Sequence, residues 1–491
     1  MAGILRNKSI LLLLLVLAIA SFFRLWQLDS IPPGLYPDVA INGNDALDSI
    51  KTGDFKLFYP ENNGREGLMM WLIAFSFSIF GASVWSIKIV AALIGISTVL
   101  GLYLLTKELF NKNVALLSSF FLAVSFWHVN FSRIGFRAIL VPFVLVFAFY
   151  FLFKGFRTKS FLNFLISGLF FGLGFYTYIS YRLIVLLLPL ILICWWYLRK
   201  DKKLLIGTAV FLLTAFLVAL PLGIYFLYHP QDFIARATGV SVFSQPNMIL
   251  AFGKSLIIHL GMFNIFGDSN WRHNFSGDPM LPWSVGILFL AGIFLSIKEG
   301  ISSIRKKEHA RFMLHIFLLS WFFAMLLPGV LTYEGIPHSL RAIGVIPVVY
   351  VFAGFGGWKV YEFLAQNAKR KKLLTFASFF FLFAMVLASF NQYFVKWARN
   401  LNVQGAFTTN FADIGYFLNS LPENIQKYVV VNEGGVPVPF PNGLPMPSQT
   451  PIFIERTKYG EPRAIYLLPE DLNKIRKDEN TIIIFLKNEK R

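Results

Sequence analysis

The chain is poor in cysteine and in charge, and both shortages limit what it can be. It has one cysteine in 491 residues, Cys194, which excludes an intramolecular disulfide and a metal cluster built from cysteines. Charged residues make up only 14%, whereas hydrophobic residues make up 56% and aromatic residues 17%, with a mean hydropathy of +0.61. A chain this apolar does not fold around one soluble core. We therefore predict a polytopic membrane protein.

Acidic residues are scarcer than basic ones, since 26 Asp and Glu accompany 45 Lys and Arg for a formal net charge of +19. The cations occur in short clusters between apolar runs rather than along one stripe, which argues against nucleic acid as the partner. Clusters recur at every second connection, as cytoplasmic loops require. They begin at Arg6, Lys107, Lys154, Arg199, Arg305 and Lys369.

Apolar run length predicts an all-α polytopic bundle of about 11 transmembrane helices, because about 20 helical residues cross a hydrocarbon core of about 30 Å. The predicted spans are Ser9–Leu28, Ser86–Thr106, Val114–Phe131, Phe136–Phe153, Phe161–Ile179, Leu183–Leu198, Leu204–Tyr228, Pro282–Ile297, Phe312–Leu331, Ala342–Leu364 and Leu373–Phe390. Leu68–Gly81 reaches only about 21 Å as a helix, so we expect it not to span. The first segment also resembles a signal peptide, but its apolar run continues to Trp26, which favours an uncleaved anchor.

Two parts follow from this topology. Residues 1–391 form the predicted transmembrane domain, with a long first external loop at 29–85 and another external loop at 229–281. Residues 392–491 have the composition of a soluble segment, which predicts a small extracytoplasmic α/β domain. Its predicted elements are an amphipathic helix at Phe411–Leu421 and strands at Tyr428–Val431, Pro451–Glu455, Ala464–Leu468 and Thr481–Leu486.

Cations also lie at the outer ends of apolar segments, where the positive-inside bias makes them uncommon. They are Lys88, Arg133, Arg137, Arg182 and Arg341. Such side chains often extend only to lipid headgroups, but five on one side favour an anionic ligand. Asp38, in the first external loop, is the candidate acid beside them. Its alternative role is an ordinary N-cap, because it follows Pro37 and precedes a predicted helix.

The order and spacing of several motifs resemble the GT-C membrane glycosyltransferases that use polyprenyl-phosphate sugars, in particular the protein O-mannosyltransferase and aminoarabinose-transferase-like group. The resemblance covers roughly Phe22–Leu364. It depends on Phe23-Arg24-Leu25, Pro32-Pro33-Gly34, Phe80-Gly81 with Lys88, Ser132-Arg133, and Arg341 followed by Pro347. Relatives have an Asp-Glu pair in the first external loop. This chain has Asp38-Val39 instead, and it also lacks the acidic residue that often follows the Ser-Arg corner.

The resemblance implies a GT-C-like bundle and an enzyme that moves a hexose or pentose from a polyprenyl-phosphate donor to an acceptor hydroxyl at the outer membrane face, with inversion expected. The reaction needs a base for the acceptor proton and cations for the phosphate that leaves. Asp38 is the predicted base. The five outer cations are the predicted phosphate ligands, with Arg suited to holding two oxygens at once.

Other polar residues of the external loops are candidates for sugar or acceptor recognition, with a self-contained loop network as the alternative. They are Arg65, Glu66, Asp268, Arg272, His273, Asn274, Glu334 and His338. No HxxxH or HxH spacing occurs, so no metal site is predicted and no cofactor is certain. A divalent metal is compatible with the sequence but not favoured.

Two other functions fit part of the pattern. An envelope polysaccharide polymerase or O-antigen-ligase-like enzyme would also have outer arginines, but would use diphosphate-linked donors. A lipid-linked sugar transporter or flippase would carry charges at mid-span, whereas these charges gather at the outer face. The predicted partners are a polyprenyl-phosphate sugar, an unknown acceptor and the bilayer. We expect a bacterial inner membrane, a cytoplasmic N-terminus and an extracytoplasmic C-terminal domain.

Overall fold

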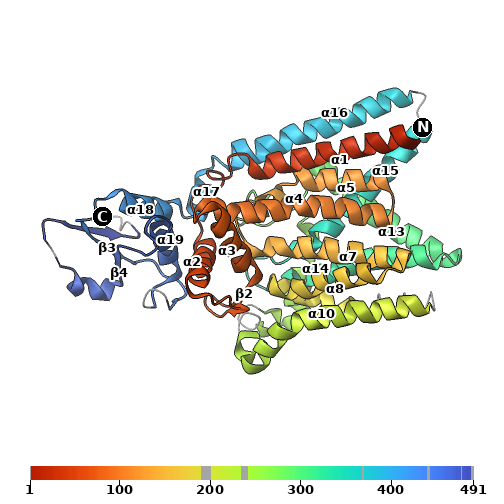
Figure 1. Cartoon of the computed structure of the whole chain (residues 1–491). Helices are drawn as coiled ribbons and strands as arrows, with labels where there is room; N and C mark the ends of the chain where they lie inside the picture. The colour runs from red at the N-terminus through yellow and green to blue at the C-terminus, as the bar shows by residue number, and fades with distance from the viewer. Residues whose placement is uncertain are drawn as a thin grey trace. The chain divides into compact units, whose positions relative to one another are not determined.

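The computed structural model describes residues 2–188, 201–233, 241–367, 370–439, 443–476 and 478–487 (Figure 1). Cys194 and most of the predicted span Leu183–Leu198 lie outside these ranges. The chain divides into two compact units. We call Met1–Trp26, Ala92–Ser132 and Arg137–Lys396 the helical unit, and Gln27–Ala91, Arg133–Phe136 and Trp397–Arg491 the mixed unit.

The helical unit is built from apolar helices of different lengths. They are α1 (Ala2–Leu25), α5 (Lys112–Val124), α6 (Phe126–Phe131), α7 (Leu140–Thr158), α8 (Phe161–Leu173), α10 (Lys202–Tyr228), α12 (Met248–Gly261), α13 (Trp283–Arg305), α14 (His309–Val330), α15 (Ile346–Asn367) and α16 (Lys371–Phe390). Helix α4 (Val84–Leu109) begins in the mixed unit and continues into the helical one. In the described part of the chain, 8 helices are long and apolar enough to cross a membrane. The prediction of a multi-pass, mainly helical membrane protein is confirmed.

Glycines allow helices of this unit to approach one another closely. Figure 1 shows α13 and α15 in the bundle, and these two helices pack together. A Cβ atom on Gly292 of α13 would lie 2.0 Å from the carbonyl oxygen of Phe352, and one on Gly356 of α15 would lie 2.1 Å from that of Leu288. Small residues serve the same purpose in other membrane bundles, where close backbone contact replaces the hydrophobic drive for helices to associate.

A buried arginine joins α1 to the end of α5. Arg24 Nη1 donates to the carbonyl oxygens of Ala20 and Ala123 at 3.0 Å, and Nη2 donates to that of Leu122 at 3.3 Å. Nη2 also lies 2.7 Å from Nδ1 of His128. An ion this deeply buried requires such partners. The arginine of the Phe-Arg-Leu motif therefore has a structural role within the helical unit.

Some predicted spans differ in the structure. The expected continuous span Val114–Phe131 breaks at Ser125, whose extended backbone ends α5 and whose Oγ caps α6 by accepting the His128 N–H. The expected span Phe161–Ile179 contains the 13-residue α8 followed by 3-10 turns. Helix α12 lies within the segment expected to be a loop. The exact number of spans therefore stays a prediction.

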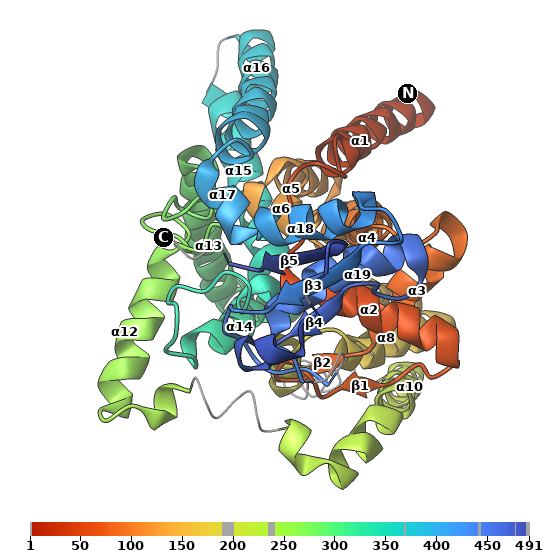
Figure 2. The ribbon, with the colours of Figure 1, turned by 90° about the vertical axis from the view of Figure 1, so that its left-hand side faces the viewer.

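The mixed unit contains a small parallel sheet with the strand order β4-β3-β5 (Figure 2). The strands are β3 (Gln426–Val430), β4 (Ile465–Leu467) and β5 (Thr481–Phe485). Helices α18 (Thr409–Ser420) and α19 (Gln449–Tyr459) pack together, and residues of both belong to the apolar core with this sheet. The expected strand Pro451–Glu455 is wrong, because these residues lie in α19. Gly460 ends that helix in the left-handed conformation, at φ 77°.

The first loop belongs to the same compact unit as this sheet. It forms α2 (Pro37–Thr52), a hairpin of β1 (Phe58–Tyr59) and β2 (Arg65–Glu66), and α3 (Leu68–Phe80). Helix α17 (Leu401–Ala406) also lies in this unit. The Arg456 guanidinium of α19 donates to the backbone oxygen of Asn44 at 3.2 Å and forms an ion pair with Asp48 of α2. The predicted parts were residues 1–391 and 392–491. By its contacts, the first loop instead belongs to the same compact unit as the C-terminal sheet.

Candidate functional site

Asp38 lies in the first turn of α2 without capping it. The N-cap position is Tyr36, Pro37 occupies the first turn, and Asp38 Oδ1 accepts a hydrogen bond of 2.9 Å from Asn62 Nδ2. Asn62 is in the turn between β1 and β2, with φ 53°. The structure therefore does not support the N-cap alternative. The amide of Asn62 orients the carboxylate instead, and the dipole at the start of α2 favours its negative charge.

A cavity of about 500 Å³ within the mixed unit opens at Asp38. The residues that surround it come from the first loop and from the part of the unit that follows Trp397. The lining residues are Tyr36, Pro37, Asp38, Asn62, Gly405, Thr408, Asn410, Phe411, Glu433, Gly434, Gly435, Val436, Met446, Pro447 and Lys487. Hydroxyl, amide, carboxylate and ammonium groups thus share one cavity with apolar side chains. This mixture suits a ligand with several hydroxyl groups.

Glu433 and Lys487 add an ion pair to this cavity. Lys487 Nζ lies 2.9 Å from Glu433 Oε2. The backbone around Lys487 is held by Asn432, which accepts from the Lys487 N–H and donates to the Lys487 carbonyl, both at 2.8 Å. Sequence reasoning did not identify Glu433, Lys487 or Asn62. The sequence carries no local signal for them, because the cavity depends on contacts between distant parts of the chain.

Two predicted phosphate ligands, Lys88 and Arg133, are buried in the mixed unit and bind backbone carbonyls of the segment before α2. Lys88 Nζ donates to the oxygen of Pro32 at 2.8 Å. The Arg133 guanidinium donates to the oxygens of Gln27 at 3.1 Å and Ile31 at 2.9 Å. Both side chains therefore fix the entry to the loop that carries Asp38. Their phosphate role stays a prediction.

The other three predicted phosphate ligands belong to the helical unit. Arg137 lies over the Tyr178 ring at 5.2 Å. Arg182 lies over the Phe233 ring at 4.6 Å and donates to the carbonyl oxygen of the same residue at 3.0 Å. Arg341 donates to the Glu334 carbonyl oxygen at 3.1 Å, and its guanidinium lies 3.6 Å from the Glu334 carboxylate. No contact in the described structure tests whether they bind phosphate.

Arg65 and Glu66 are buried in the β1–β2 hairpin. The Arg65 guanidinium binds Asn42 Oδ1 at 3.0 Å, Asp45 Oδ2 at 2.5 Å and the Glu61 carbonyl oxygen at 3.2 Å. Burial raises the pKa of Asp45, although the facing Arg65 acts in the opposite direction. Arg65 therefore holds the hairpin, and with it Asn62, against α2. Its predicted contact with the acceptor remains untested.

Asp268, His273 and His338 lie together in the helical unit, although about 70 residues separate the last from the other two. Asp268 Oδ2 accepts from the Ser339 backbone N–H and hydroxyl at 2.8 Å, and lies 3.0 Å from His273 Nδ1. The rings of His273 and His338 have centroids 5.1 Å apart. Sequence spacing gave no sign of this cluster, because two separate loops form it.

The remaining loop candidates are part of the same loop network. Asn274 Nδ2 donates to the Asp278 carbonyl oxygen at 2.6 Å. The Arg272 backbone N–H donates to Asn270 Oδ1 at 3.0 Å, and its carbonyl accepts from Asn130 at 2.6 Å. The loop bonds to itself, and it also bonds to Asn130 of α6 and to Ser339 of the loop after α14. Substrate recognition by these side chains stays a prediction.

The environment of the cluster changes the pKa values of two members. Burial alone would raise the pKa of Asp268, but the facing His273 and His338 hold it well below its usual range. Burial lowers the pKa of His338 well below its usual value, and the nearby His273 and Arg341 act in the same direction. Both shifts favour a negative Asp268 beside a neutral His338.

We expect the folded state to lose stability as the pH falls below about 6.5, the ordinary pKa of histidine. The unfolded chain then binds a proton that folded His338 resists, which costs up to about 1.4 kcal/mol per pH unit. Thermal unfolding of the purified protein between pH 7.5 and pH 5.5, with a chelator present, measures this dependence. His338→Gln should reduce the slope, whereas the exposed His229→Gln should not. Equal slopes in both variants would contradict the assignment.

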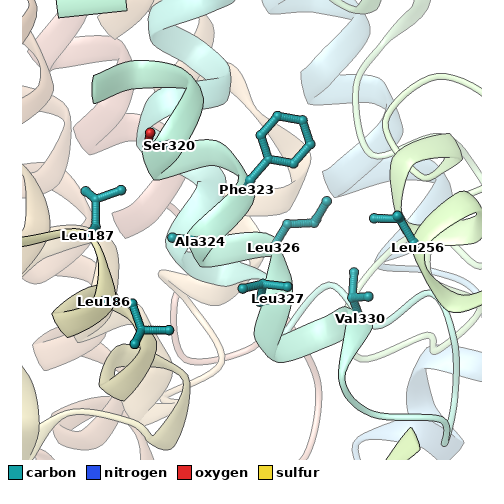
Figure 3. Close-up of a pocket in the computed structure, with 9 residues that line it drawn as sticks. All are labelled: Leu186, Leu187, Leu256, Ser320, Phe323, Ala324, Leu326, Leu327 and Val330. Carbon is teal, nitrogen blue, oxygen red and sulfur yellow. The ribbon is translucent and has the colours of Figure 1, made fainter. Parts of the chain in front are cut away.

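A separate, apolar cavity of about 280 Å³ lies in the helical unit (Figure 3). Its side chains come from the 3-10 helix Ile179–Leu186 and the residue after it, from α12 and from α14. The lining residues are Leu186, Leu187, Leu256, Ser320, Phe323, Ala324, Leu326, Leu327 and Val330. Only Ser320 carries a polar side-chain group, so this cavity suits a hydrocarbon ligand.

Comparisons of the sequence with known proteins found partial matches to mannosyltransferases. The model of dolichyl-phosphate-mannose-protein mannosyltransferases matches residues 68–228. A putative mannosyltransferase of Bacillus subtilis (strain 168), YkcB, is 29% identical over 181 residues, which cover 35% of this chain and 24% of that protein. The matched region thus spans about a quarter of the curated relative.

Solved structures extend the likeness to nearly the whole chain. ArnT from Cupriavidus metallidurans bound to undecaprenyl phosphate has a TM-score of 0.54 at 14% identity, covering 96% of this chain and 91% of that one. The Archaeoglobus fulgidus oligosaccharyltransferase tethered with an acceptor peptide has a TM-score of 0.54 at 14% identity, covering 87% and 62%. At 14% sequence identity, the likeness shows a similar fold and nothing more. The predicted resemblance to the GT-C membrane glycosyltransferases is confirmed.

Proposed function

We propose that this protein is a membrane glycosyltransferase that moves a sugar from a polyprenyl-phosphate donor to an acceptor hydroxyl at the outer face of the membrane. The observation that carries the proposal is the position of Asp38. Its carboxylate is oriented by Asn62 and opens into a cavity of about 500 Å³ with polar groups suited to a sugar. The likeness to ArnT, which was solved with undecaprenyl phosphate, supports the donor class.

In this proposal Asp38 is the general base. Asn62 donates to Oδ1, and among the residues that the structure describes no other hydrogen bond to this carboxylate occurs. Oδ2 can therefore accept the proton of the acceptor hydroxyl as that oxygen attacks the sugar. The bond from the sugar to the donor phosphate breaks at the same time, and the phosphate leaves with an added negative charge. A base in hydrogen-bond reach typically contributes about 10²–10⁴-fold to such a reaction.

The donor requires two further environments, a cationic one for its phosphate and an apolar one for its chain. The predicted phosphate ligands are Lys88, Arg133, Arg137, Arg182 and Arg341. Electrostatic stabilisation of the charge that develops on a leaving group is usually the largest single contribution to catalysis. The apolar cavity of the helical unit is the proposed contact for part of the hydrocarbon chain.

Donor selection tests this function against the diphosphate-dependent alternative. Purified protein in lipid nanodiscs is incubated with radiolabelled monosaccharides on polyprenyl monophosphate, and in parallel with sugars on polyprenyl diphosphate. We expect label to leave the monophosphate donors, with envelope extract supplying acceptors. Release from the diphosphate donors alone would identify a polymerase or ligase. Movement of intact donor between leaflets, without cleavage, would identify a transporter.

Asn62→Gly should lower transfer about tenfold, because a hydrogen bond to a charged group is worth about 1.5–3 kcal/mol and part of its orienting effect is lost. Glycine adopts the left-handed conformation of residue 62 without strain. Asn63→Gly is the matched control, since the neighbouring Asn63 also has a left-handed backbone, at φ 62°, but its side chain is exposed. Initial rates of sugar transfer measure the effect. Equal rates in the two variants would exclude orientation of Asp38 by Asn62.

A further inference from the structure

Two threonine hydroxyl groups meet at one carbonyl oxygen of the first loop. The Leu35 oxygen accepts from Thr408 Oγ1 at 3.1 Å and from Thr450 Oγ1 at 3.0 Å. Thr408 directly precedes α18, and Thr450 lies in the first turn of α19, so both hydroxyls come from the part of the mixed unit that follows Trp397. A carbonyl oxygen has two lone pairs, which matches these two donors. The Leu35 carbonyl group is therefore held by two separate segments.

Leu35 lies three residues before Asp38, at the entry to α2. The Tyr36 carbonyl oxygen accepts the N–H groups of Val39 at 2.9 Å and Ala40 at 3.1 Å. These bonds form the first turn of the helix, in which Asp38 lies. Because the Leu35 carbonyl and the Tyr36 N–H belong to one planar peptide unit, fixing that carbonyl fixes the backbone that leads into the turn. The direction of the Asp38 side chain depends on this backbone.

Thr408 has a backbone conformation that its residue type rarely adopts. Its φ of 49° and ψ of 48° are left-handed, where a β-branched residue is strained. Thr408 is the N-cap residue of α18, and a threonine hydroxyl at this position usually accepts from the first N–H groups of the helix. None of the N–H groups that the structure describes in α18 donates to it. The hydroxyl donates to Leu35 instead, and strain that is maintained in this way is concentrated at functional sites.

The first loop also approaches the Thr408 segment closely at Gly34. A Cβ atom on Gly34, which has φ 70°, would lie 2.5 Å from the Phe407 carbonyl oxygen and 2.9 Å from Thr409 Cα. Glycine is the residue type without a Cβ atom, so it permits this approach. Thr408 lies between the two contacted residues and lines the same cavity as Asp38. The tight contact and the strained threonine therefore occur together beside the proposed base.

A purely structural explanation is that the two hydroxyls satisfy a buried carbonyl group. Leu35 is 2% exposed, and a buried carbonyl oxygen requires at least one donor. Thr450, which is fully buried, already supplies that donor. The structural explanation thus accounts for Thr450. It gives no reason for a second donor that is held in a strained conformation at residue 408.

We propose that Thr408 is a positioning residue for Asp38 and acts through the Leu35 carbonyl group. The inference rests on the proposed function, in which the Asp38 carboxylate is the base. Such positioning matters for the rate, because a displacement of about 1 Å can cost about 10²-fold. Asn62 orients the carboxylate directly, whereas Thr408 and Thr450 hold the backbone from which it extends. The C-terminal part of the chain thereby contributes to the reaction itself.

Thr408→Val tests this role, because it removes the hydroxyl and keeps the branched shape of the side chain. We expect kcat for release of radiolabelled sugar from polyprenyl monophosphate to fall about tenfold, with the KM for donor unchanged, since one of the two anchors remains. Thr408→Ser keeps the hydroxyl and should restore kcat. Thr409→Val is the matched control and should retain the wild-type rate, because the Thr409 hydroxyl donates at 3.0 Å to Gln404 of its own segment.

A double-mutant cycle shows whether Thr408 acts through Asp38. In the Asp38→Asn background, Thr408→Val should lower the residual rate less than about twofold, because the group that it positions is already absent. Hydrogen exchange followed by mass spectrometry adds a readout that does not depend on activity. The N–H groups of Val39 and Ala40 should exchange faster in Thr408→Val than in the wild type, and Thr409→Val should leave their exchange unchanged.

The outcomes distinguish this inference from the proposed function. Each rate is divided by the folded fraction, which size-exclusion chromatography in detergent measures. A wild-type kcat in Thr408→Val, no recovery in Thr408→Ser, or an equal loss with and without the Asp38 carboxylate would overturn the positioning role and leave the base assignment intact. A wild-type rate in Asp38→Asn would contradict the base assignment, and this inference with it.

Discussion

Asp38→Asn is expected to reduce sugar transfer by about 10²–10⁴-fold, the usual contribution of a general base. Asparagine has nearly the shape of aspartate, and its oxygen can still accept the hydrogen bond from Asn62. The loop should therefore remain folded. The amide cannot take up the acceptor proton, so kcat should fall more than the affinity for donor. Release of radiolabelled sugar from a polyprenyl monophosphate at saturating donor measures the change.

Asp54→Asn is the control for this loss, because Asp54 follows α2 in the same loop and is exposed. It should retain the wild-type rate. Asp38→Glu keeps a carboxylate but moves it by one methylene, so partial activity is expected. A wild-type rate in Asp38→Asn would exclude Asp38 as the base, whatever the other variants show. Equal binding of donor by wild type and Asp38→Asn would show that the defect lies in the reaction.

Arg65→Met should destabilise the mixed unit by about 3–5 kcal/mol, the usual cost of breaking a buried ion pair from one side. The guanidinium is buried and joins the hairpin to Asn42 and Asp45 of α2. Its removal leaves the Asp45 carboxylate without its charge partner. Because Asn62 lies in the same hairpin, transfer should also fall. Urea unfolding in detergent, followed by tryptophan fluorescence, gives the loss of stability.

Lys51→Met provides the contrast, because Lys51 pairs with Glu461 but both side chains are more than half exposed. Exposed pairs contribute about 0–1 kcal/mol, so this variant should be nearly as stable as the wild type. Arg65→Met/Asp45→Leu should be more stable than Arg65→Met alone, since no unpaired charge remains. Equal stability of Arg65→Met and Lys51→Met would contradict a structural role for the buried pair.

Hydropathy predicted most of the helical unit because membrane insertion depends on local composition. Eight predicted spans coincide with helices of sufficient length, among them α4, α10 and α13. The strand expected at Pro451–Glu455 was wrong, because that prediction also used local composition alone. Ile452, Phe453 and Ile454 are of types frequent in strands, but here they are buried residues of α19, a short helix that is capped by Gly460. Tertiary packing decided that element against its local preference.

In the candidate site, too, the sequence identified individual residues but not the residues that lie next to them. The sequence selected Asp38 from its place in the first loop and from a family resemblance, and it selected His273 and His338 as loop residues. It offered no reason to join Asp38 with Glu433 and Lys487, or His338 with Asp268. The roles of all these side chains in binding and catalysis stay predictions that the proposed experiments test.

The sequence by itself determined that this is a multi-pass membrane protein, because the free energy of placing a segment in lipid depends on that segment's own side chains. Only the tertiary structure decided which polar groups meet. The first loop and the C-terminal sheet form one compact unit through contacts such as Arg456 with Asp48. Such contacts join residues about 400 positions apart, and local periodicity carries no information about pairs at that separation.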